Sequence, residues 1–177
     1  PNPSFETNSG FPSALGDFSL ATNWNNCNGT ATPDYLNISG TNAAMLPVGV
    51  GGIGKFNPNS GSGIMALIIK GELFGDYREY MDVPLTTPLI VGATYDVSFY
   101  MANAGDLGKN GLRSNNIGVN FSVGALTQVG FAALNIVPTW NYNTVFYDTT
   151  WTLVSFQFTP TAAVDHITIG NFYNDVA

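Results

Sequence analysis

The sequence predicts an all-β protein built from two antiparallel sheets, on three observations. Aromatic residues that favour strands are plentiful, with 12 Phe and 8 Tyr, and Val, Ile and Thr are frequent. The 20 Gly and 10 Pro residues are spread along the chain and separate short apolar runs. In the longer runs, apolar and polar residues alternate with a period of two. No segment has a convincing helical pattern, and no internal repeat is present.

About eight strands are expected, which fits a two-sheet antiparallel β-sandwich of the jelly-roll type. The first 63 residues are rich in Asn, Gly, Pro and Thr and predict one strand at 4–7, followed by long loops that Trp24, Tyr35 and Leu36 hold to the body of the protein. Clearer strand patterns follow, at 64–69, 77–83, 94–102, 116–123, 131–137, 150–159 and 166–171.

Two of these strands show their alternation clearly. In 94–102, one face carries Tyr95, Val97, Phe99 and Met101, and the other carries Asp96, Ser98, Tyr100 and Ala102. In 150–159, one face carries Thr152, Val154, Phe156 and Phe158, and the other carries Trp151, Leu153, Ser155 and Gln157. Each strand has one largely apolar face and one mixed face, as the strands of a sandwich require.

The charge balance excludes several classes of partner. The 177 residues include five Lys and Arg against twelve Asp and Glu, which gives a net charge of −7. This charge repels phosphate backbones and anionic lipid, so nucleic acid is not an expected partner. The longest apolar run, 64–69, ends at Lys70 and is too short to cross a bilayer, so membrane insertion is not expected either.

The length fits one domain with a substantial core, residues 1–177. Cys27 is the only cysteine, so no internal disulfide stabilises the chain. A chain that starts at Pro1 is typical of a processed or excised part of a larger exported protein, which predicts an extracellular or cell-surface location. Only a tenth of the residues are charged, and a surface of Asn, Thr, Ser and Gly also suits close assembly with neighbouring subunits.

The two ends of the chain suggest how the sandwich closes. Each is a short strand-like run with a carboxylate beside apolar residues, at 2–6 and 167–175. Pairing these two edge strands would bring Glu6 close to Asp175. We therefore expect the termini to meet in one sheet.

Several segments along the chain form a characteristic series of motifs: Asn2-Pro3-Ser4-Phe5-Glu6, Trp24-Asn25, Thr32-Pro33-Asp34-Tyr35, Tyr77-Arg78-Glu79-Tyr80, Tyr95-Asp96-Val97-Ser98-Phe99-Tyr100, Asn116-Ile117-Gly118-Val119 and Trp151. In order and spacing they resemble the galactose-binding-like jelly rolls that serve as carbohydrate-binding modules, in particular those of secreted and surface proteins of Bacteroidetes. The resemblance spans nearly the whole chain. Modules of this shape bind glycans, bind proteins or act as spacers, so the resemblance is more specific for fold than for function.

The resemblance also implies a structural Ca²⁺ where the first and last strands meet. Glu6 and Asp175 would be its carboxylate ligands, with Asn174 as a further oxygen and backbone carbonyls from a loop such as 19–26 completing the shell. Ca²⁺ takes six to eight oxygen ligands in irregular geometry, which such a set would satisfy. The alternative is that Glu6 and Asp175 are ordinary edge-strand carboxylates.

A sugar site needs exposed rings for the C–H faces and fixed polar groups for the hydroxyls. The segment Thr139-Trp140-Asn141-Tyr142-Asn143 reads as a loop with two large rings, and Trp140, Asn141 and Tyr142 are the expected stacking platform. Further lining residues are expected from Tyr77, Arg78, Tyr80 and Asn103. The favoured alternative is that the two loop rings pack on the core and that Arg78 pairs with an internal carboxylate. Trp24 and Trp151 are assigned to the core.

Catalysis has little support in the sequence. His166 lies in an apolar alternation and Cys27 lies in an Asn-rich loop, so no nucleophile and base are assembled. Glu79 and Asp82 would point to opposite faces of a strand, which does not suit a glycosidase pair. The sequence therefore predicts a non-catalytic extracellular module that binds glycan or promotes adhesion. The alternative is a structural subunit of a surface fibre, sheath or adhesin stalk.

Overall fold

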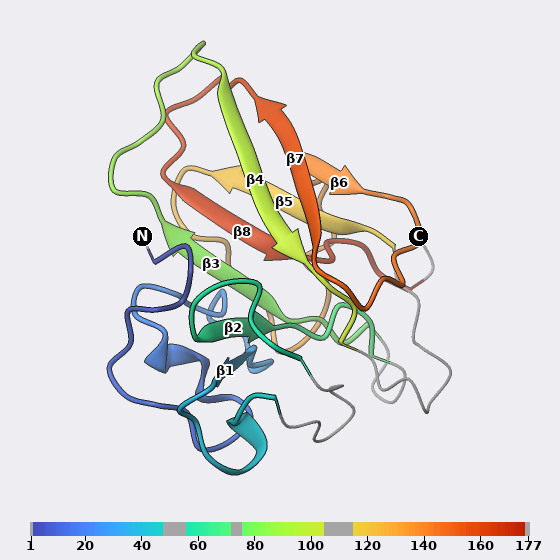
Figure 1. The fold of residues 1–177 in the computed structure, drawn as a ribbon. Coiled ribbons are helices and arrows are strands. Elements are labelled where there is room, and N and C mark those ends of the chain that lie inside the picture. The colour runs from blue at the N-terminus through green and yellow to red at the C-terminus, as the bar shows by residue number, and fades with distance from the viewer. Residues whose placement is uncertain (1, 48–55, 72–75, 105–114, 176–177) are drawn as a thin grey trace.

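The chain folds into eight β-strands and two short 3-10 helices within residues 2–47, 56–71, 76–104 and 115–175, which are the residues that the computed structural model describes (Figure 1). In chain order these are η1 (Asp17–Leu20), β1 (Asp34–Asn37), η2 (Asn42–Ala44), β2 (Gly63–Ala66), β3 (Tyr80–Pro84), β4 (Tyr95–Met101), β5 (Ile117–Ser122), β6 (Trp140–Tyr142), β7 (Thr152–Phe158) and β8 (His166–Gly170). The described residues contain no α-helix, and none of their helices has the length and apolar character needed to cross a membrane. The prediction of an all-β fold with antiparallel pairing is confirmed.

The strands form three hydrogen-bonded sheets. One has four strands in the order β3-β8-β5-β6, and two have two strands each, β4-β7 and β1-β2. All these pairings are antiparallel. The β4-β7 sheet, hereafter the β4–β7 ribbon, lies in front of the four-stranded sheet in Figure 1, and β1-β2 lies below both.

Apolar side chains fill the space between the β4–β7 ribbon and the four-stranded sheet. The cluster comprises Val119, Phe121, Val164, Leu89, Val97, Phe99, Trp140, Phe156, Phe158, Ile167 and Ile169. The rings of Phe121 and Phe158 stack with centroids 4.3 Å apart, and those of Trp140 and Phe156 stack at 4.5 Å. Burial of these rings is the main favourable term holding the two layers together.

A second layer of residues covers the other face of the four-stranded sheet, which carries buried polar groups. Asp82, Thr168 and Asn120 lie side by side on β3, β8 and β5, and Thr168 donates a hydrogen bond to Asp82 at 2.8 Å. Cys27, Tyr80, Phe172, Leu126, Leu134 and Ile136 form an apolar cluster. Within it Tyr80 and Phe172 sit against Gly170 and Gly118, where a Cβ atom would collide with their rings.

The strongest alternations in the sequence gave accurate strands. The expectations for 94–102, 116–123, 150–159 and 166–171 correspond to β4, β5, β7 and β8. In β4 and β7 the burial alternates as predicted, with Val97, Phe99, Val154 and Phe156 turned inward. The expectations for 64–69 and 77–83 correspond to β2 and β3, which are shorter and shifted.

The expected strand at 4–7 is wrong. The backbone of Thr7 is bonded to a side chain, because its N–H donates to Asn2 Oδ1 at 3.0 Å and its carbonyl accepts from Asn2 Nδ2 at 2.6 Å. Phe5 adopts a positive φ of 62°, which an extended strand does not allow. The opening segment is therefore a turn closed by Asn2.

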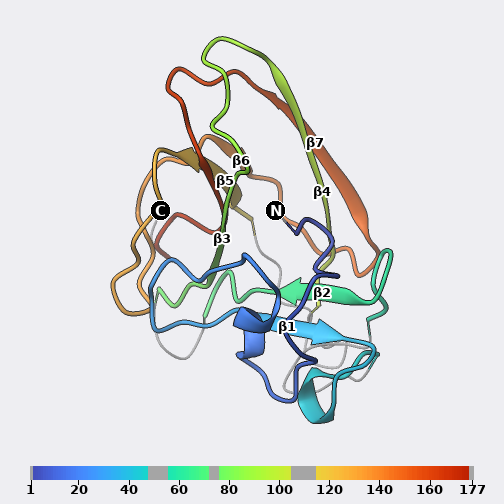
Figure 2. The same cartoon turned by 90° about the vertical axis from the view of Figure 1, so that its left-hand side faces the viewer.

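The expected pairing of the two termini is also wrong. β8 is not an edge strand, since it lies between β3 and β5 in the four-stranded sheet. The described N-terminal and C-terminal segments lie on different sides of the molecule (Figures 1 and 2).

Residues 131–137 are not a strand, although they were predicted to be one. Side chains hold this segment in place of a neighbouring strand: Gln128 Nε2 donates to the Ala132 carbonyl at 3.0 Å, and the Leu134 N–H donates to the Tyr80 hydroxyl at 3.1 Å. The strand in this part of the chain is β6, which had been expected to be a loop. It pairs with β5 from Val119↔Trp140 to Ile117↔Tyr142.

Candidate ligand-binding face

The outer face of the β4–β7 ribbon carries the arrangement best suited to a ligand. Successive residues of a strand point to opposite sides, so the inward apolar residues leave an outward row on each strand. This outer face consists of Asp96, Ser98 and Tyr100 on β4 and of Leu153, Ser155 and Gln157 on β7, all of them exposed. The face is open to solvent along its length, as a site for an extended ligand requires.

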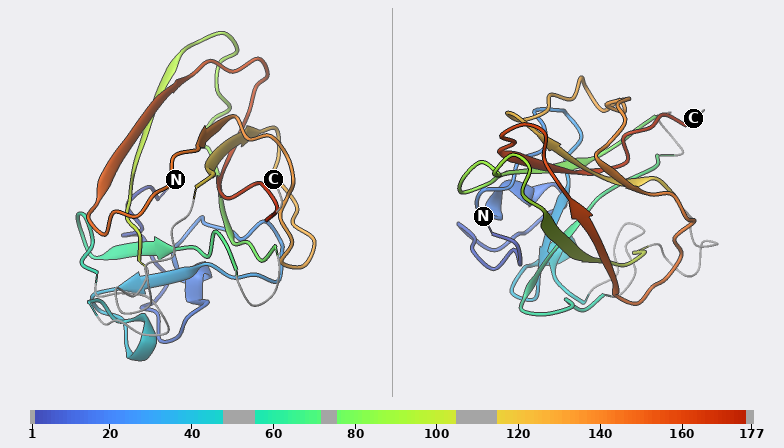
Figure 3. Two further views of the ribbon diagram at one scale, coloured as in Figure 1. Left: turned by 90° about the vertical axis from the view of Figure 1, so that its right-hand side faces the viewer. Right: turned by 90° about the horizontal axis from the view of Figure 1, so that it is seen from above.

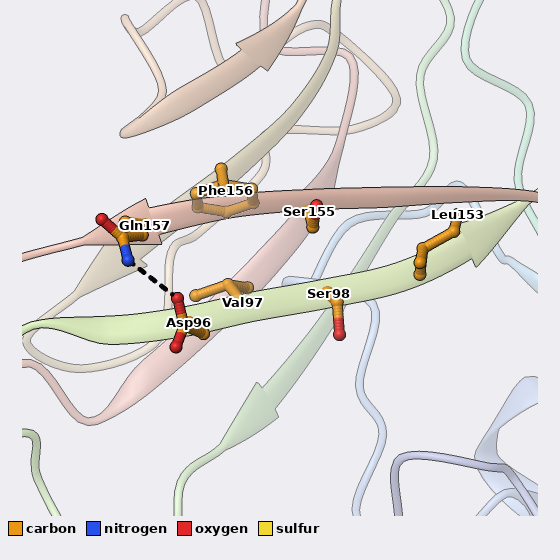
Figure 4. A pocket seen from close by; sticks show the side chains of 7 residues that line it. All are labelled: Asp96, Val97, Ser98, Leu153, Ser155, Phe156 and Gln157. Atoms are coloured by element: carbon orange, nitrogen blue, oxygen red, sulfur yellow. Dashed lines mark hydrogen bonds between the residues drawn. The ribbon is translucent and has the colours of Figure 1, made fainter.

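The strand register places these six residues in three cross-strand pairs. Asp96 faces Gln157, Ser98 faces Ser155, and Tyr100 faces Leu153. Gln157 Nε2 donates a hydrogen bond to Asp96 Oδ1 at 3.0 Å, which fixes both side chains (Figure 4). One end of the face is thus polar and preorganised, the middle holds two hydroxyls, and the other end is apolar.

A shallow groove of about 530 Å³ runs along this face. Its lining comprises Asp96, Ser98, Leu153, Ser155 and Gln157 together with Val97 and Phe156, two residues whose side chains also pack in the inner cluster (Figure 4). Tyr100 is not part of this lining and lies further along β4, opposite Leu153. The volume lies within the range of small-molecule sites, although the groove is open and not enclosed. A ligand here would keep much of its surface in water.

Tyr100 supplies the exposed ring of this face. Its side chain is 49% exposed, and that of Leu153 opposite it is 54% exposed. An exposed tyrosine ring beside an apolar neighbour offers a surface for the C–H face of a sugar, while the Asp96–Gln157 pair and the two serine hydroxyls offer donors and acceptors. The sequence suggested such a combination of rings and polar groups in the loop around Trp140, whereas here the groups lie on two strands of a sheet.

The expected platform at Trp140 and Tyr142 is built differently from the prediction. Both residues lie on strand β6 and are half-buried. Phe156 covers one face of Trp140 at an interplanar angle of 4°, and Phe99 meets its edge. Tyr142 packs edge-on against Phe146. The rings therefore pack on the core, as the alternative interpretation held.

Asn141 lies between these two rings and is also half-buried. Its Nδ2 donates to Asn116 Oδ1 at 2.9 Å. Its Oδ1 is buried and has no hydrogen-bond partner among the described residues. This amide ties β6 to the start of β5 and does not face an open groove.

Arg78 is a structural residue in this fold. Its side chain is 1% exposed, and its guanidinium donates to the carbonyls of Tyr77 and Tyr173 and to Asp175 at 2.6 Å. The pKa of Asp175 is lowered, mainly because its carboxylate accepts the hydrogen bond from Arg78. Arg78 thus ties the C-terminal segment to the chain before β3, as the alternative interpretation proposed, and cannot reach a ligand.

The other expected lining residues do not meet on one surface. Tyr80 is fully buried, where its hydroxyl donates to the Asn171 carbonyl, and burial raises its pKa to about 12. Tyr77 stacks on Phe131 and donates to Glu79 at 3.2 Å. Asn103 lies beyond β4, where its N–H donates to the Asp148 carbonyl at 2.7 Å.

The two carboxylates expected to bind Ca²⁺ have separate protein partners. Glu6 Oε1 accepts the N–H groups of Ser62 and Gly63 at 2.8 and 2.9 Å, at the start of β2. Asp175 is held by Arg78 and by the N–H of Asp76. The described residues contain no group of three His, Cys, Asp or Glu that could hold a metal ion. Glu6 and Asp175 therefore bind different segments of the chain, and the expected Ca²⁺ stays a prediction that metal removal tests.

Cys27 and His166 both lie near the buried Asp82. The Cys27 thiol is buried, and burial together with the charge of Asp82 raises its pKa to about 12, so it stays neutral. His166 Nδ1 lies 2.9 Å from Asp165, and its Nε2 lies 4.0 Å from Asp82. Glu79 contacts different groups from Asp82, namely the Ile68 N–H and the Tyr77 hydroxyl.

Sequence reasoning placed Asp96, Ser98 and Tyr100 on a mixed strand face but did not nominate them as a site. The signal was present, because a tyrosine among polar outward positions of an otherwise well-patterned strand is an exposed ring. Trp140 drew attention instead because polar residues surround it in the sequence. Only the contact with Phe156 shows that its ring is covered.

No known protein-family profile matches the chain, and no curated protein matches it in sequence. The structure shows a mostly β-strand protein with antiparallel sheets.

Proposed function

We propose that this protein is a non-catalytic extracellular module that binds glycans on the outer face of its β4–β7 ribbon. We further propose that its fold is a two-sheet β-sandwich of the jelly-roll type, as in carbohydrate-binding modules. A sugar ring would stack on Tyr100 and bond to Ser98 and Ser155. The Asp96–Gln157 pair lies four residues along β4, about 13 Å away at about 3.3 Å per residue, so it would bond to another sugar unit of the same glycan.

The single observation that carries the proposal is the exposed Tyr100 ring at one end of a row of fixed polar side chains on an open sheet face. Sugars present apolar C–H faces and directional hydroxyls together, so a site needs both kinds of group within one ring's reach. Other exposed rings in the described residues, such as Phe11, do not lie on this face.

Two further observations support the proposal. The shared apolar cluster between the β4–β7 ribbon and the four-stranded sheet is the core that a sandwich requires. The neutral, buried thiol of Cys27 is unsuited to nucleophilic attack, which favours a binding role over a catalytic one.

Glycan-array screening followed by calorimetric titration tests this function. We expect weak affinity, because an open groove leaves most of the ligand in water. Tyr100→Ala should remove binding to the best glycan, with Kd rising by about tenfold or more, which corresponds to about 1.4 kcal/mol. The melting temperature should stay close to that of the parent, because the ring is half exposed.

Phe11→Ala is the matched control, since Phe11 is 58% exposed and lies in the N-terminal loops. It removes a solvent-facing ring without touching the outer face and should leave glycan binding unchanged. The proposal is contradicted if the best glycan binds equally well to the parent and to Tyr100→Ala. It is also contradicted if no arrayed glycan binds.

A structural role in a surface assembly is the second candidate. Among the described residues, neither β4 nor β7 pairs with a strand beyond the ribbon. Strands with unpaired edges can add a strand from another chain. This observation favours assembly independently of any sugar.

A further inference from the structure

Among the residues that the structure describes, β7 is a regular strand with one unpaired edge. Within the described ranges it pairs with β4 alone, through seven consecutive residue pairs from Tyr95↔Phe158 to Met101↔Thr152. The segments on both sides of β7, 143–151 and 159–165, are described and supply no strand beside it. Figure 2 and the left view of Figure 3 show β7 at the outer margin of the molecule.

This edge lacks the features that normally block strand addition. Natural edge strands are protected by lysines, prolines, bulges or short length. β7 is seven residues long, contains no Gly, Pro or Lys, and keeps an unbroken register with β4. The segment between Asp148 and Asp165 contains no charged residue, although the whole chain has a net charge of −7.

We propose that β7 is a self-association edge, to which the β7 strand of a second copy of this chain adds in antiparallel orientation. A strand that pairs with its own copy around a twofold axis at Ser155 places Ser155 opposite Ser155, Val154 opposite Phe156, and Leu153 opposite Gln157. Residues of the inner face then meet inner-face residues, and outer-face residues meet outer-face residues. Such an isologous contact closes at two subunits.

Charge favours a second copy over a foreign strand. Two molecules with a net charge of −7 each repel one another over most of their surfaces, and repulsion is smallest where both present an uncharged segment. Residues 149–164 are such a segment, and the twofold pairing sets no like charges opposite each other. A basic peptide would find no carboxylate on the β7 edge to pair with.

The resulting dimer would have one continuous four-stranded sheet in the order β4-β7-β7-β4. The two outer faces would lie side by side on it. This inference stands on the edge of β7 and does not require that the outer face binds sugar.

Sedimentation velocity over a range of protein concentrations tests the dimer. We expect the parent protein to shift from monomer to dimer as concentration rises. Ser155→Lys would set two ammonium groups opposite each other at the twofold axis, where like charges oppose pairing, and should raise the dimer Kd by about tenfold or more. Ser155 is exposed, so the circular dichroism spectrum and the melting temperature should match those of the parent at concentrations where both proteins are monomeric.

Ser98→Lys is the matched control. Ser98 is the cross-strand partner of Ser155 on the same outer face, but on β4. In the proposed dimer the two Ser98 positions lie three strand spacings apart, roughly 14 Å at about 4.8 Å per spacing. Ser98→Lys should therefore leave the dimer Kd close to the parent value.

Oxidative cross-linking gives a second measurement, which does not require the fold to accommodate a lysine at position 155. Ser155→Cys should form a disulfide-linked dimer at high protein concentration, because the two positions face each other across the axis. Ser98→Cys should not, and Cys27 is buried and does not compete. Any of three results overturns the proposal. The parent protein stays monomeric at all concentrations, both lysine variants weaken the dimer equally, or both cysteine variants cross-link equally.

Discussion

Buried polar side chains in this protein connect segments that are distant in the sequence. Arg78 joins the chain before β3 to the C-terminal segment through Tyr173 and Asp175, across almost one hundred residues. Asn171 donates to the Ile69 carbonyl at 3.0 Å, and Gln128 donates to the carbonyl of Arg78 at 2.8 Å. Each such group would cost free energy if it were buried without a partner, so these contacts specify where the loops lie.

Glu79 is the buried residue with the most direct consequence for pH. Its carboxyl accepts the Ile68 N–H at 2.6 Å, and burial, the largest cause, raises its pKa from 4.5 to about 7. The folded state therefore binds this proton more tightly than the unfolded chain does. The stability that the protonated group contributes is complete below pH 4.5 and is lost as pH rises through 7.

Replacing Glu79 with Gln should remove this pH dependence, since the amide has the shape of the protonated acid. We expect the free energy of unfolding of the parent to fall by about 3 kcal/mol relative to Glu79→Gln between pH 4.5 and pH 8, at 1.36 kcal/mol per pKa unit. Urea denaturation of both proteins across this range measures the difference. Parallel pH profiles would show that the pKa of Glu79 is the same in the folded and unfolded states, which contradicts the prediction.

The difference between the two profiles is needed because other carboxylates titrate in the same range. Burial also raises the pKa values of Asp34 and Asp82. Their contributions have the same sign, and that of Asp82 cancels when the variant is compared with the parent. The charge of Asp34 also raises the Glu79 pKa, so the difference between the profiles includes this interaction.

At the level of elements, regular alternation identified strands well and short segments poorly. β4, β5, β7 and β8 each have five or more residues, and tertiary burial of one face agrees with their pattern. β6 has three residues, too few for a period of two to be recognised, and its pairing with β5 is a long-range contact. Residues 131–137 have strand composition, but the side chains of Gln128 and Tyr80 bond to their backbone instead.

The role of β6 can be tested at Trp140. Trp140→Ala would remove the ring stacked on Phe156 and the edge contact with Phe99, so we expect it to lower the free energy of unfolding by about 3 kcal/mol. Chemical denaturation provides the measurement. Trp140→Phe should lose less, because it keeps a ring against Phe156.

Tyr100→Ala serves as the exposed comparison for Trp140→Ala, with an expected change within about 0.5 kcal/mol. If Trp140→Ala is as stable as the parent, Trp140 does not contribute to the core and the sugar platform expected from the sequence regains support.

At the scale of the whole molecule, the separation of the terminal carboxylates bears on metal binding. Glu6 is bonded to the start of β2, and Asp175 is bonded to Arg78. A metal that binds only the folded state raises its stability, so its removal lowers the melting temperature. A bound metal that contributed 1 kcal/mol would raise the melting temperature of a small domain by several degrees. Because we expect no shared site, EDTA should leave the melting temperature unchanged within about 1 °C.

Thermal unfolding with EDTA, and with added Ca²⁺ as the converse measurement, checks this expectation. A drop of several degrees with EDTA that Ca²⁺ restores would instead show a calcium site. Glu6→Gln would then establish whether Glu6 is one of its ligands.

The sequence by itself determined the all-β class, four of the eight strands nearly to their ends, and the inward and outward faces of β4 and β7, because side-chain direction along a strand is a local property with a period of two. The sequence also predicted correctly that Trp24 is buried in the core, where its Nε1 donates to the Asn2 carbonyl at 2.8 Å. Only the tertiary structure decided the central place of β8, the partners of Glu6, Arg78 and Asp175, and the covering of Trp140 by Phe156. These features depend on which distant segments meet, and no local pattern encodes that choice.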